Sequence, residues 1–265
     1  MIELINVKKS FGDGTDKKTV LNGVNLKLEK GDFVTVIGGN GAGKSTLLNA
    51  IGGSIFVDEG KIIIGGKDIT RTPEHKRAAF LGRVFQDPLN GTAADMQIIE
   101  NLALAKRRGK RKTLRWCIGK NETEEYKALL KEFDLGLDER LTQKVGTLSG
   151  GQRQVVTLLM CTIVTPKLLL LDEHTAALDP VTADKVMKIT NNIVKENNIT
   201  TMMITHNMSQ ALVTGTRTIM MDSGEIIIDL DSETRKEMNV SDLLKLYRER
   251  EMKDFDNDRM LLQKD

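Results

Sequence analysis

The chain has 265 residues, of which 40% are hydrophobic and only 4% aromatic. A chain of this length can bury a large aliphatic core as one domain with a subdomain, without disulfides or metals as staples. The formal net charge of +2 comes from nearly balanced acids and bases, which argues against a nucleic-acid-binding protein driven by overall charge and leaves room for a local basic patch.

Cysteine usage and hydropathy indicate a cytoplasmic protein without a membrane span. Cys117 and Cys161 lack metal or redox spacing, which is typical of reduced thiols. The amino terminus enters a strand without a basic-then-apolar leader. The best apolar run, 155–164, is about half of the roughly 20 residues that a membrane helix needs. If the protein works at a membrane, we expect another chain to span it.

The first elements in chain order predict a small antiparallel sheet followed by a phosphate-binding loop. Apolar and polar residues alternate over 2–7 and 20–28, with turn signals at Asp13-Gly14 and Asn22-Gly23. An apolar strand over 33–37 then leads into GGNGAGKS, which fits G-x-x-x-x-G-K-[ST]. The loop consists of Gly38, Gly39, Asn40, Gly41, Ala42 and Gly43.

This loop favours a nucleoside triphosphate because its backbone N–H groups and the dipole of the following helix converge on one point. Lys44 would reach the β- and γ-phosphates, and the Ser45 hydroxyl would hold Mg²⁺. Thr46, which opens the expected helix over 46–51, would lie on the α-phosphate side. The alternative is an ordinary glycine-rich turn between a strand and a helix.

The rest of the chain predicts an α/β protein with a helical insertion. From Met96 to Val164 the pattern is helical with no clear buried strand. The other expected elements are strands at 61–64, 81–85, 168–171 and 200–204, a helix start at 72–74, an amphipathic helix at 184–197, a hairpin at 219–222 and 225–228, and a helix from Ser241 with a charged, frayed end.

A basic run lies inside the helical insertion. It covers Lys106 to Lys112 and is followed by Arg115 and Trp116. Three interpretations stay open: a solvated helix end or loop, a basic surface near anionic lipid head groups or a partner, and a nucleic-acid contact.

Two acidic residues follow the apolar run LLLL at 168–171. In a parallel sheet the carboxyl edge is where ligands bind. Asp172 is therefore placed to bind Mg²⁺, directly or through water. Glu173 points to the other side of the strand and could polarise an attacking water, which is worth on the order of 10²–10⁴ in rate.

The segment LSGGQ opens the helix expected from Arg153 to Val164. Ser149 is suited to cap this helix, and Gly150 and Gly151 permit close backbone approach. Together with Gln152 they form either a plain helix cap or a second anion-binding helix terminus. Because one nucleotide needs one such terminus, the second would serve a neighbouring molecule.

In combination, these motifs resemble the ATP-binding subunit of an ATP-binding cassette (ABC) transporter over about residues 1–230. The matching segments, in order, are the Walker A loop GGNGAGKS, the Q-loop residue Gln86, the signature LSGGQ, the Walker B segment LLLLDE, the D-loop Ala177-Leu178-Asp179, and His206 after the strand MMIT. The resemblance implies a P-loop NTPase (RecA-like) α/β fold. Its parallel-sheet core would carry an antiparallel β subdomain and an inserted α-helical subdomain.

The implied boundaries are 1–86 for the ATP-binding core with its antiparallel subdomain, 87–164 for the helical signature subdomain, 165–230 for the rest of the core and 231–265 for a C-terminal helical tail. The implied partners are a second ATP-binding subunit, which we expect to be a copy of this chain, and a multi-span permease. The expected location is the cytoplasmic face of the membrane, and no nucleic acid is expected.

The resemblance also implies residue roles. Each ATP with its Mg²⁺ would lie between Lys44 of one subunit and Ser149 of the other. Gln86 would sense the γ-phosphate and Mg²⁺ and link to the permease, His206 would contact the γ-phosphate, and Asp179 would bridge the subunits. Phe11 would stack on adenine, although the family more often has Tyr there; the alternative is a plain core or hairpin aromatic. Stacking is worth roughly 1–3 kcal/mol in nucleic-acid binders.

One residue departs from the family pattern. His174 stands where the family usually has proline, directly after Glu173. A proton relay is one interpretation, and we favour a loop side chain near the site. His75 lies in a charged helix start and is expected to be solvated.

The segments DEHTAALDP, KVGTLSGGQRQVVTLLM and NLALAKRRGKRKTLRW resemble a bacterial subgroup that works with a permease and a substrate-binding lipoprotein, in some cases for tryptophan or tyrosine. Solute import is therefore the favoured function. An exporter or lipid-extraction ATPase is an alternative. A translation or DNA-repair ATPase is disfavoured, because those carry two cassettes or a long coiled-coil insertion.

Overall fold

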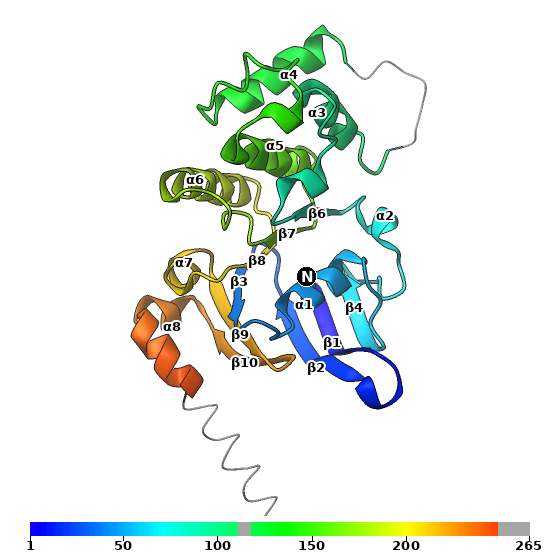
Figure 1. Cartoon of the computed structure of the whole chain (residues 1–265), viewed down its shortest axis with the longest axis vertical. Helices are drawn as coiled ribbons and strands as arrows, with labels where there is room; N and C mark the ends of the chain where they lie inside the picture. Colours follow the sequence, from blue (N-terminus) through cyan, green and yellow to red (C-terminus); the bar gives the residue numbers. More distant parts are fainter. Residues whose placement is uncertain (111–117, 249–265) are drawn as a thin grey trace, which may run out of the picture.

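The computed structural model describes residues 1–110 and 118–248, and its centre is a six-stranded sheet (Figure 1). Strand β10 pairs antiparallel with β9, and the other neighbouring strands of this sheet pair in parallel. Across the sheet the strands are β10 (Glu225–Leu230), β9 (Arg217–Asp222), β3 (Phe33–Gly38), β8 (Thr201–Ile204), β7 (Leu168–Asp172) and β6 (Leu81–Val84).

The parallel arrangement brings the predicted chemical motifs to one edge. The glycine-rich loop follows β3, Gln86 follows β6, and His206 follows β8, while Asp172 ends β7. Because parallel strands share the edge at which their carboxyl ends meet, segments far apart in sequence converge there.

A second, antiparallel sheet precedes and flanks the core, as the sequence predicts. Its strands are β2 (Lys18–Leu28), β1 (Ile2–Phe11), β4 (Glu59–Ile64) and β5 (Lys67–Asp68). The turn expected at Asn22-Gly23 is wrong, because both residues lie inside β2. The register between β1 and β2 shifts at this point, so the glycine serves a bulge instead. The turn at Asp13-Gly14 contains the short 3₁₀ helix η1 (Gly14–Asp16).

The helical insertion lies at one end of the molecule, away from β1, β2 and β4 (Figure 1). It contains α3 (Ile98–Lys106), α4 (Lys120–Lys131) and α5 (Gly150–Thr162), with the 3₁₀ helices η2 (Pro88–Gly91) and η3 (Val145–Thr147). The remaining helices are α1 (Lys44–Gly52), α2 (Glu74–Arg77), α6 (Pro180–Glu196), α7 (Met208–Val213) and α8 (Ser232–Lys236). Helix α6 begins ahead of the expected Asp184, because Asp179 caps it and Pro180 fits its first turn.

Side-chain alternation along β7 divides the core in two. Leu169 and Leu171 join the cluster that packs α3, α4, α5 and α6 against one face of the sheet. Leu168 and Leu170 join the cluster on the other face, which surrounds α1 and extends to the antiparallel sheet. Successive side chains of a strand point to opposite faces. Asp172 therefore continues the α1 face.

The carboxyl-terminal segment packs against the core sheet. Residues 240–248 are helical, as expected for the tail, and Leu243 is fully buried in a third cluster with Ile37 of β3 and Met220 of β9. The tail expected from 249 onward lies outside the described residues. Within the described part of the chain, no helix has both the length and the apolar character that crossing a bilayer requires.

Part of the basic run packs against the protein instead of facing solvent. Arg108 donates hydrogen bonds to the carbonyls of Cys161, in the last turn of α5, and Val164, just after the helix, and Lys106 pairs with Glu125. Residues 111–117, with Arg115, Trp116 and Cys117, lie outside the described residues. For Arg108 the expectation of a solvated side chain is wrong, because the guanidinium caps a helix end.

A fully buried arginine joins α1 to the loops beside it. The Arg77 guanidinium donates to the carbonyls of Ala50 and Ile51 at 2.7 Å each, near the end of α1. The same side chain donates to the carbonyls of Thr72, Ile69 and Thr70 at 2.6, 2.8 and 3.1 Å. Every one of its nitrogens therefore has a partner, and the residue acts as a structural staple.

Replacing this staple should destabilise the fold. Arg77→Met leaves five carbonyls without their donor, and we expect the free energy of unfolding to fall by about 3 kcal/mol or more. Urea denaturation followed by circular dichroism measures the change, with the exposed Arg71→Met as the matched control. A loss below about 1 kcal/mol would show that water replaces the guanidinium at little cost.

Candidate functional site

The glycine-rich loop adopts a backbone that requires glycine at two positions. Gly38 has a φ of 146°, and a Cβ there would lie 2.1 Å from the Met221 carbonyl oxygen. Gly43 has a φ of 97°, and its Cβ would lie 2.7 Å from the Val20 carbonyl oxygen. Both contacts are too short for any side chain, so the tight turn between β3 and α1 depends on these residues. The amide groups of such a turn form an anion-binding concavity.

Lys44 lies over this loop. Its Nζ donates to the carbonyl oxygens of Gly38 and Gly39 at 2.8 Å each, and the residue is only 5% exposed. Burial lowers the pKa of Lys44, while the carboxylates of Glu173 and Asp172 act in the opposite direction. The ammonium group is thus held where an incoming phosphate would meet it, in the field of both acids.

A cavity of about 180 Å³ opens between this loop and two residues from other strands. Glu173 after β7 and His206 after β8 form the opposite wall. The loop side of the wall consists of Asn40, Gly41, Ala42, Gly43, Lys44, Ser45 and Thr46, with Val20 beside them. The fold thereby unites the loop, the acid and the histidine that the sequence indicates.

Glu173 and His206 are in direct contact at the edge of this cavity. Their Oε1 and Nε2 atoms are 2.6 Å apart, with the acid side chain 12% exposed and the histidine side chain 50% exposed. Glu173 has a φ of 48°, a conformation that is uncommon for a residue with a side chain. Strained backbone of this kind is concentrated at functional sites. The pair can hold a carboxylate in place to accept a proton from water.

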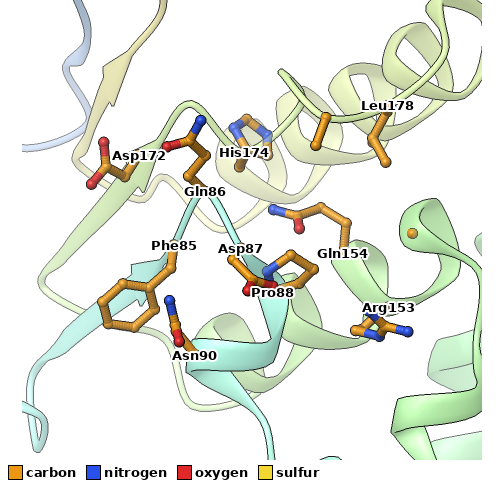
Figure 2. A pocket seen from close by; sticks show the side chains of 12 residues that line it. Phe85, Gln86, Asp87, Pro88, Asn90, Arg153, Gln154, Asp172, His174 and Leu178 are labelled. Carbon is orange, nitrogen blue, oxygen red and sulfur yellow. The ribbon is translucent and has the colours of Figure 1, made fainter.

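Asp172 and Gln86 line a second, larger cavity of about 570 Å³, on the side of β7 nearest β6 (Figure 2). The side chain of Asp172 is 17% exposed and lies 3.5 Å from a guanidinium nitrogen of Arg83. The oxygens of Asp172, Gln86 and Ser45 are of the type that Mg²⁺ prefers. Because α1 packs against β7, the Ser45 helix and the Asp172 strand are neighbours. Ser45 lines the cavity at the loop, whereas Asp172 and Gln86 line the second cavity, so their joint role as Mg²⁺ ligands stays a prediction.

Ser149 caps α5, as expected. Its Oγ accepts from the Gln152 backbone N at 3.3 Å, and Gln152 Oε1 accepts from the Ser149 N at 3.2 Å. A Cβ on Gly151 would lie 2.2 Å from Thr182 Cγ2 of α6, so glycine permits the close approach of the two helices. Ser149 and Gly150 are exposed. Among the described residues that line the cavity at the glycine-rich loop, none comes from this segment.

Two further predicted residues are exposed. Asp179 Oδ1 accepts from the Thr182 N at 3.1 Å, and hydrogen bonds from Thr182 hold the pKa of Asp179 below its ordinary value. Phe11 ends β1 and is 45% exposed, with Lys9 Nζ 5.3 Å from its ring centre. A plain core aromatic is therefore excluded. Phe11 pairs with Lys18 across the β1–β2 hairpin, so a hairpin aromatic and adenine stacking both stay open.

His174 lies in the turn after β7 and lines the cavity of Asp172 and Gln86, as favoured from the sequence, but its side chain is buried (Figure 2). The residue is 2% exposed, and its Nε2 lies 3.1 Å from Thr190 Oγ1 of α6. The Thr190 hydroxyl itself donates to the Val186 carbonyl, so it accepts from the ring N–H. Burial lowers the pKa of His174 to about 4. The ring is therefore a neutral packing group that joins the strand end to α6.

Arg83 is a residue of this region that the sequence motifs do not indicate. It contacts Asp172, Asn49 and Ser54, which come from β7, α1 and the loop after α1. The sequence could have indicated Arg83 because it is a charged residue inside the short strand LGRV, where apolar side chains are usual.

Comparisons with known proteins agree with this geometry. A family model described as ABC transporter matches residues 21–176. The tyrosine transport ATP-binding protein of Clostridioides difficile is 42% identical over 248 residues, which cover 93% of this chain and 98% of that protein. The lipoprotein-releasing system ATP-binding protein LolD of Geobacter metallireducens is 30% identical and covers 86% of this chain and 99% of that protein.

Solved structures give the same result. A dimeric ATP-binding cassette in a post-hydrolysis state with ADP and Pi superposes with a TM-score of 0.75 at 28% identity, covering 88% of this chain and 99% of that one. A nucleotide-free cassette of an ABC transporter superposes with the same TM-score and identity, covering 93% and 98%.

The buried histidine should make stability depend on pH. The folded pKa of His174 is about 4, below the value of about 6.5 in an unfolded chain. Between these values the unfolded chain binds more protons, so stability falls as the pH drops from about 6.5 to 4. At about pH 4.5 this costs wild type about 2.5 kcal/mol relative to neutral pH, and His174→Gln removes the cost.

Urea denaturation of both proteins at about pH 7 and about pH 4.5 measures this difference. Parallel pH dependence in wild type and variant would mean that the ring titrates normally in the folded protein.

Proposed function

Because the chain belongs to the ABC transporter family and is an ATPase subunit of such a transporter, we propose that two copies bind MgATP at a shared head-to-tail interface and power a membrane permease that imports a solute. ATP binding and hydrolysis follow from the family. The shared interface, the roles of single residues and the identity of the solute are the proposal.

One observation carries the proposal: the chain has a cavity at the glycine-rich loop and, outside that cavity, an exposed helix start that would complete the site in a second copy. The cavity at the loop gathers Lys44, Glu173 and His206. Ser149 and Gly150 lie exposed at the start of another helix and, among the described residues, do not line that cavity. A helix terminus with exposed N–H groups is a ready anion site. Rotation of a second copy would bring its Ser149 against the open side of the loop.

Different residues of one copy would contact different parts of the ATP molecule. The backbone N–H groups of residues 39–43 and the Lys44 ammonium would bind the β- and γ-phosphates. Ser45, Gln86 and Asp172 would hold Mg²⁺, which when bound neutralises charge on these phosphates. Thr46 would lie near the α-phosphate, and Phe11 would stack on adenine.

The catalytic step would use Glu173 and His206 at the cavity edge. Glu173 would take a proton from the attacking water while the bond between the γ-phosphorus and the β–γ bridging oxygen breaks. His206, 2.6 Å from the carboxylate, would keep it oriented and contact the γ-phosphate. From the second copy, Ser149, Gly150, Gly151 and Gln152 would close over the γ-phosphate, and Asp179 would bridge the subunits.

The transported solute would be an aromatic amino acid such as tyrosine. The similarity to a tyrosine transport ATP-binding protein at 42% identity over nearly the whole chain supports this choice. The permease, and indirectly a substrate-binding lipoprotein, would complete the system at the cytoplasmic face of the membrane, where this chain would be peripheral. No nucleic-acid partner is part of the proposal.

Lipid or lipoprotein extraction is the second candidate, supported by the 30% identity to a lipoprotein-releasing ATPase. Uptake of labelled tyrosine by cells with and without the chain and its neighbouring permease separates the two. Loss of uptake together with release of the chain from the membrane fraction when the permease is absent supports import. Unchanged uptake, or a chain that fractionates identically in both strains, overturns it.

Glu173→Gln should keep ATP binding and lose turnover. The amide cannot take a proton, so we expect hydrolysis to fall about 10²-fold or more while the MgATP-bound dimer accumulates. Phosphate release and light scattering after size exclusion measure the two effects. Hydrolysis at the wild-type rate would remove Glu173 from the role of general base.

Lys44→Ala should instead weaken ATP binding itself. Removing the only ammonium that lines the loop cavity among the described residues takes away a charge-assisted contact, and we expect affinity to fall about 10-fold or more. Titration with a fluorescent ATP analogue measures this, with the exposed Lys131→Ala as control. Equal affinity in both variants would contradict the phosphate contact.

A further inference from the structure

We infer that Arg83 is a positioning residue that fixes the spacing between the Ser45 helix and the Asp172 strand, and thereby the geometry of the Mg²⁺ site. The inference rests on the proposed function, in which Ser45 and Asp172 hold the ion. Arg83 itself would not touch the ion.

Arg83 reaches both elements with one guanidinium. Its Nη2 donates to Asn49 Oδ1 of α1 at 2.7 Å and lies 3.5 Å from Asp172 Oδ2 at the end of β7. Its Nη1 donates to Ser54 Oγ, in the loop after α1, at 3.0 Å. The Arg83 side chain is 12% exposed, and the guanidinium carbon lies 4.5 Å from the ring centre of Phe85. A rigid, planar group therefore connects three segments in a largely buried place.

The register of the sheet explains why Arg83 and Asp172 meet. Strands β6 and β7 are parallel, and Arg83 is paired with Leu170. Leu170 faces the cluster around α1. Because side chains two residues apart share a face, Asp172 also faces α1, one step nearer the carboxyl edge. The guanidinium therefore lies between α1 and the Asp172 side chain.

The position of Asn49 connects this contact to the glycine-rich loop. Ser45 lies in the first turn of α1, and Asn49 follows four residues later, which places both on the same side of the helix about one turn apart. When Arg83 holds Asn49 and Asp172 together, it also fixes how far Ser45 stands from Asp172. A shift of α1 along β7 would have to break the hydrogen bond to Asn49.

Comparison with Arg77 separates this role from a purely structural one. Arg77 is completely buried and every nitrogen of its guanidinium donates to a carbonyl. Arg83 instead leaves its Nε–H buried without a partner in the described part of the chain, and its Nη2, which also donates to Asn49, lies 3.5 Å from a carboxylate oxygen of Asp172. Arg108 and Arg235 have the same unpaired Nε, so the feature that distinguishes Arg83 is its contact with a carboxylate near the glycine-rich loop.

Charge and position predict opposite effects of removing Arg83. A cation beside a metal-binding carboxylate competes with the metal, so loss of charge alone would strengthen metal binding. Loss of the link between α1 and β7 would weaken it, because groups that orient metal ligands are worth about 10- to 100-fold in metal affinity. The sign of the change therefore decides between the two effects.

The experiment compares full-length wild type with Arg83→Gln and Arg83→Lys. The affinity for a non-hydrolysable ATP analogue is measured with Mg²⁺ and with EDTA, and the ratio of the two affinities reports the metal alone. Electron paramagnetic resonance of Mn²⁺ in the same complex reports ion binding directly. The exposed Arg71→Gln is the matched control, and Asp172→Asn tests the proposed metal site itself.

We expect the ratio to fall about 10-fold or more in both Arg83 variants, with the EDTA affinity and the Arg71 control unchanged. Lysine keeps the charge but cannot contact Asn49, Ser54 and Asp172 at once, so Arg83→Lys should not restore the wild-type affinity ratio. A raised or unchanged ratio in Arg83→Gln, a wild-type ratio in Arg83→Lys, or an equal loss with EDTA overturns the inference.

The Asp172 variant separates this failure from failure of the proposed function. If Asp172→Asn abolishes the gain in ATP-analogue affinity that Mg²⁺ gives, while the Arg83 variants keep this gain, only the role of Arg83 is wrong. If Asp172→Asn keeps this gain, the metal site assigned to Asp172 is wrong, and the inference fails with it.

Discussion

The two faces of strand β7 are the constraint on which the site depends. Leu168 and Leu170 pack toward α1, and Leu169 and Leu171 pack toward the helical insertion. Because this alternation continues past the strand end, Asp172 emerges on the face of the glycine-rich loop. Glu173 then turns through a positive φ to meet His206. One apolar run thus delivers two carboxylates to two different cavities.

In the proposed function, a second constraint would act between copies of the chain. The loop after β3 offers a cavity with an ammonium group, an acid and a histidine, and Ser149 stands exposed at a helix start elsewhere. Ser149 also caps its own helix through Gln152, so the helix cap and the proposed partner contact use the same residue. Both interpretations of LSGGQ are compatible, because a capped helix keeps further N–H groups at its start.

The sequence predicted what local chemistry controls and missed what tertiary contacts control. The loop at 38–45, the strand ending in Asp172 and the cap at Ser149 follow from turn chemistry and alternation. The burial of His174 required the position of Thr190 on α6, and the contacts of Arg83 required the register between β6 and β7. The local sequence Asn22-Gly23 predicts a turn, but the pairing of β2 with β1 keeps both residues inside the strand.

The central claim is that one triphosphate is held by Lys44 of one copy and Ser149 of another. A structure of the assembled dimer with Mg²⁺ and a non-hydrolysable ATP analogue tests it most directly. The account predicts Ser149 Oγ and the Gly151 N–H at about 3 Å from γ-phosphate oxygens that the partner subunit's Lys44 contacts. A nucleotide-bound dimer in which both groups face solvent would contradict it.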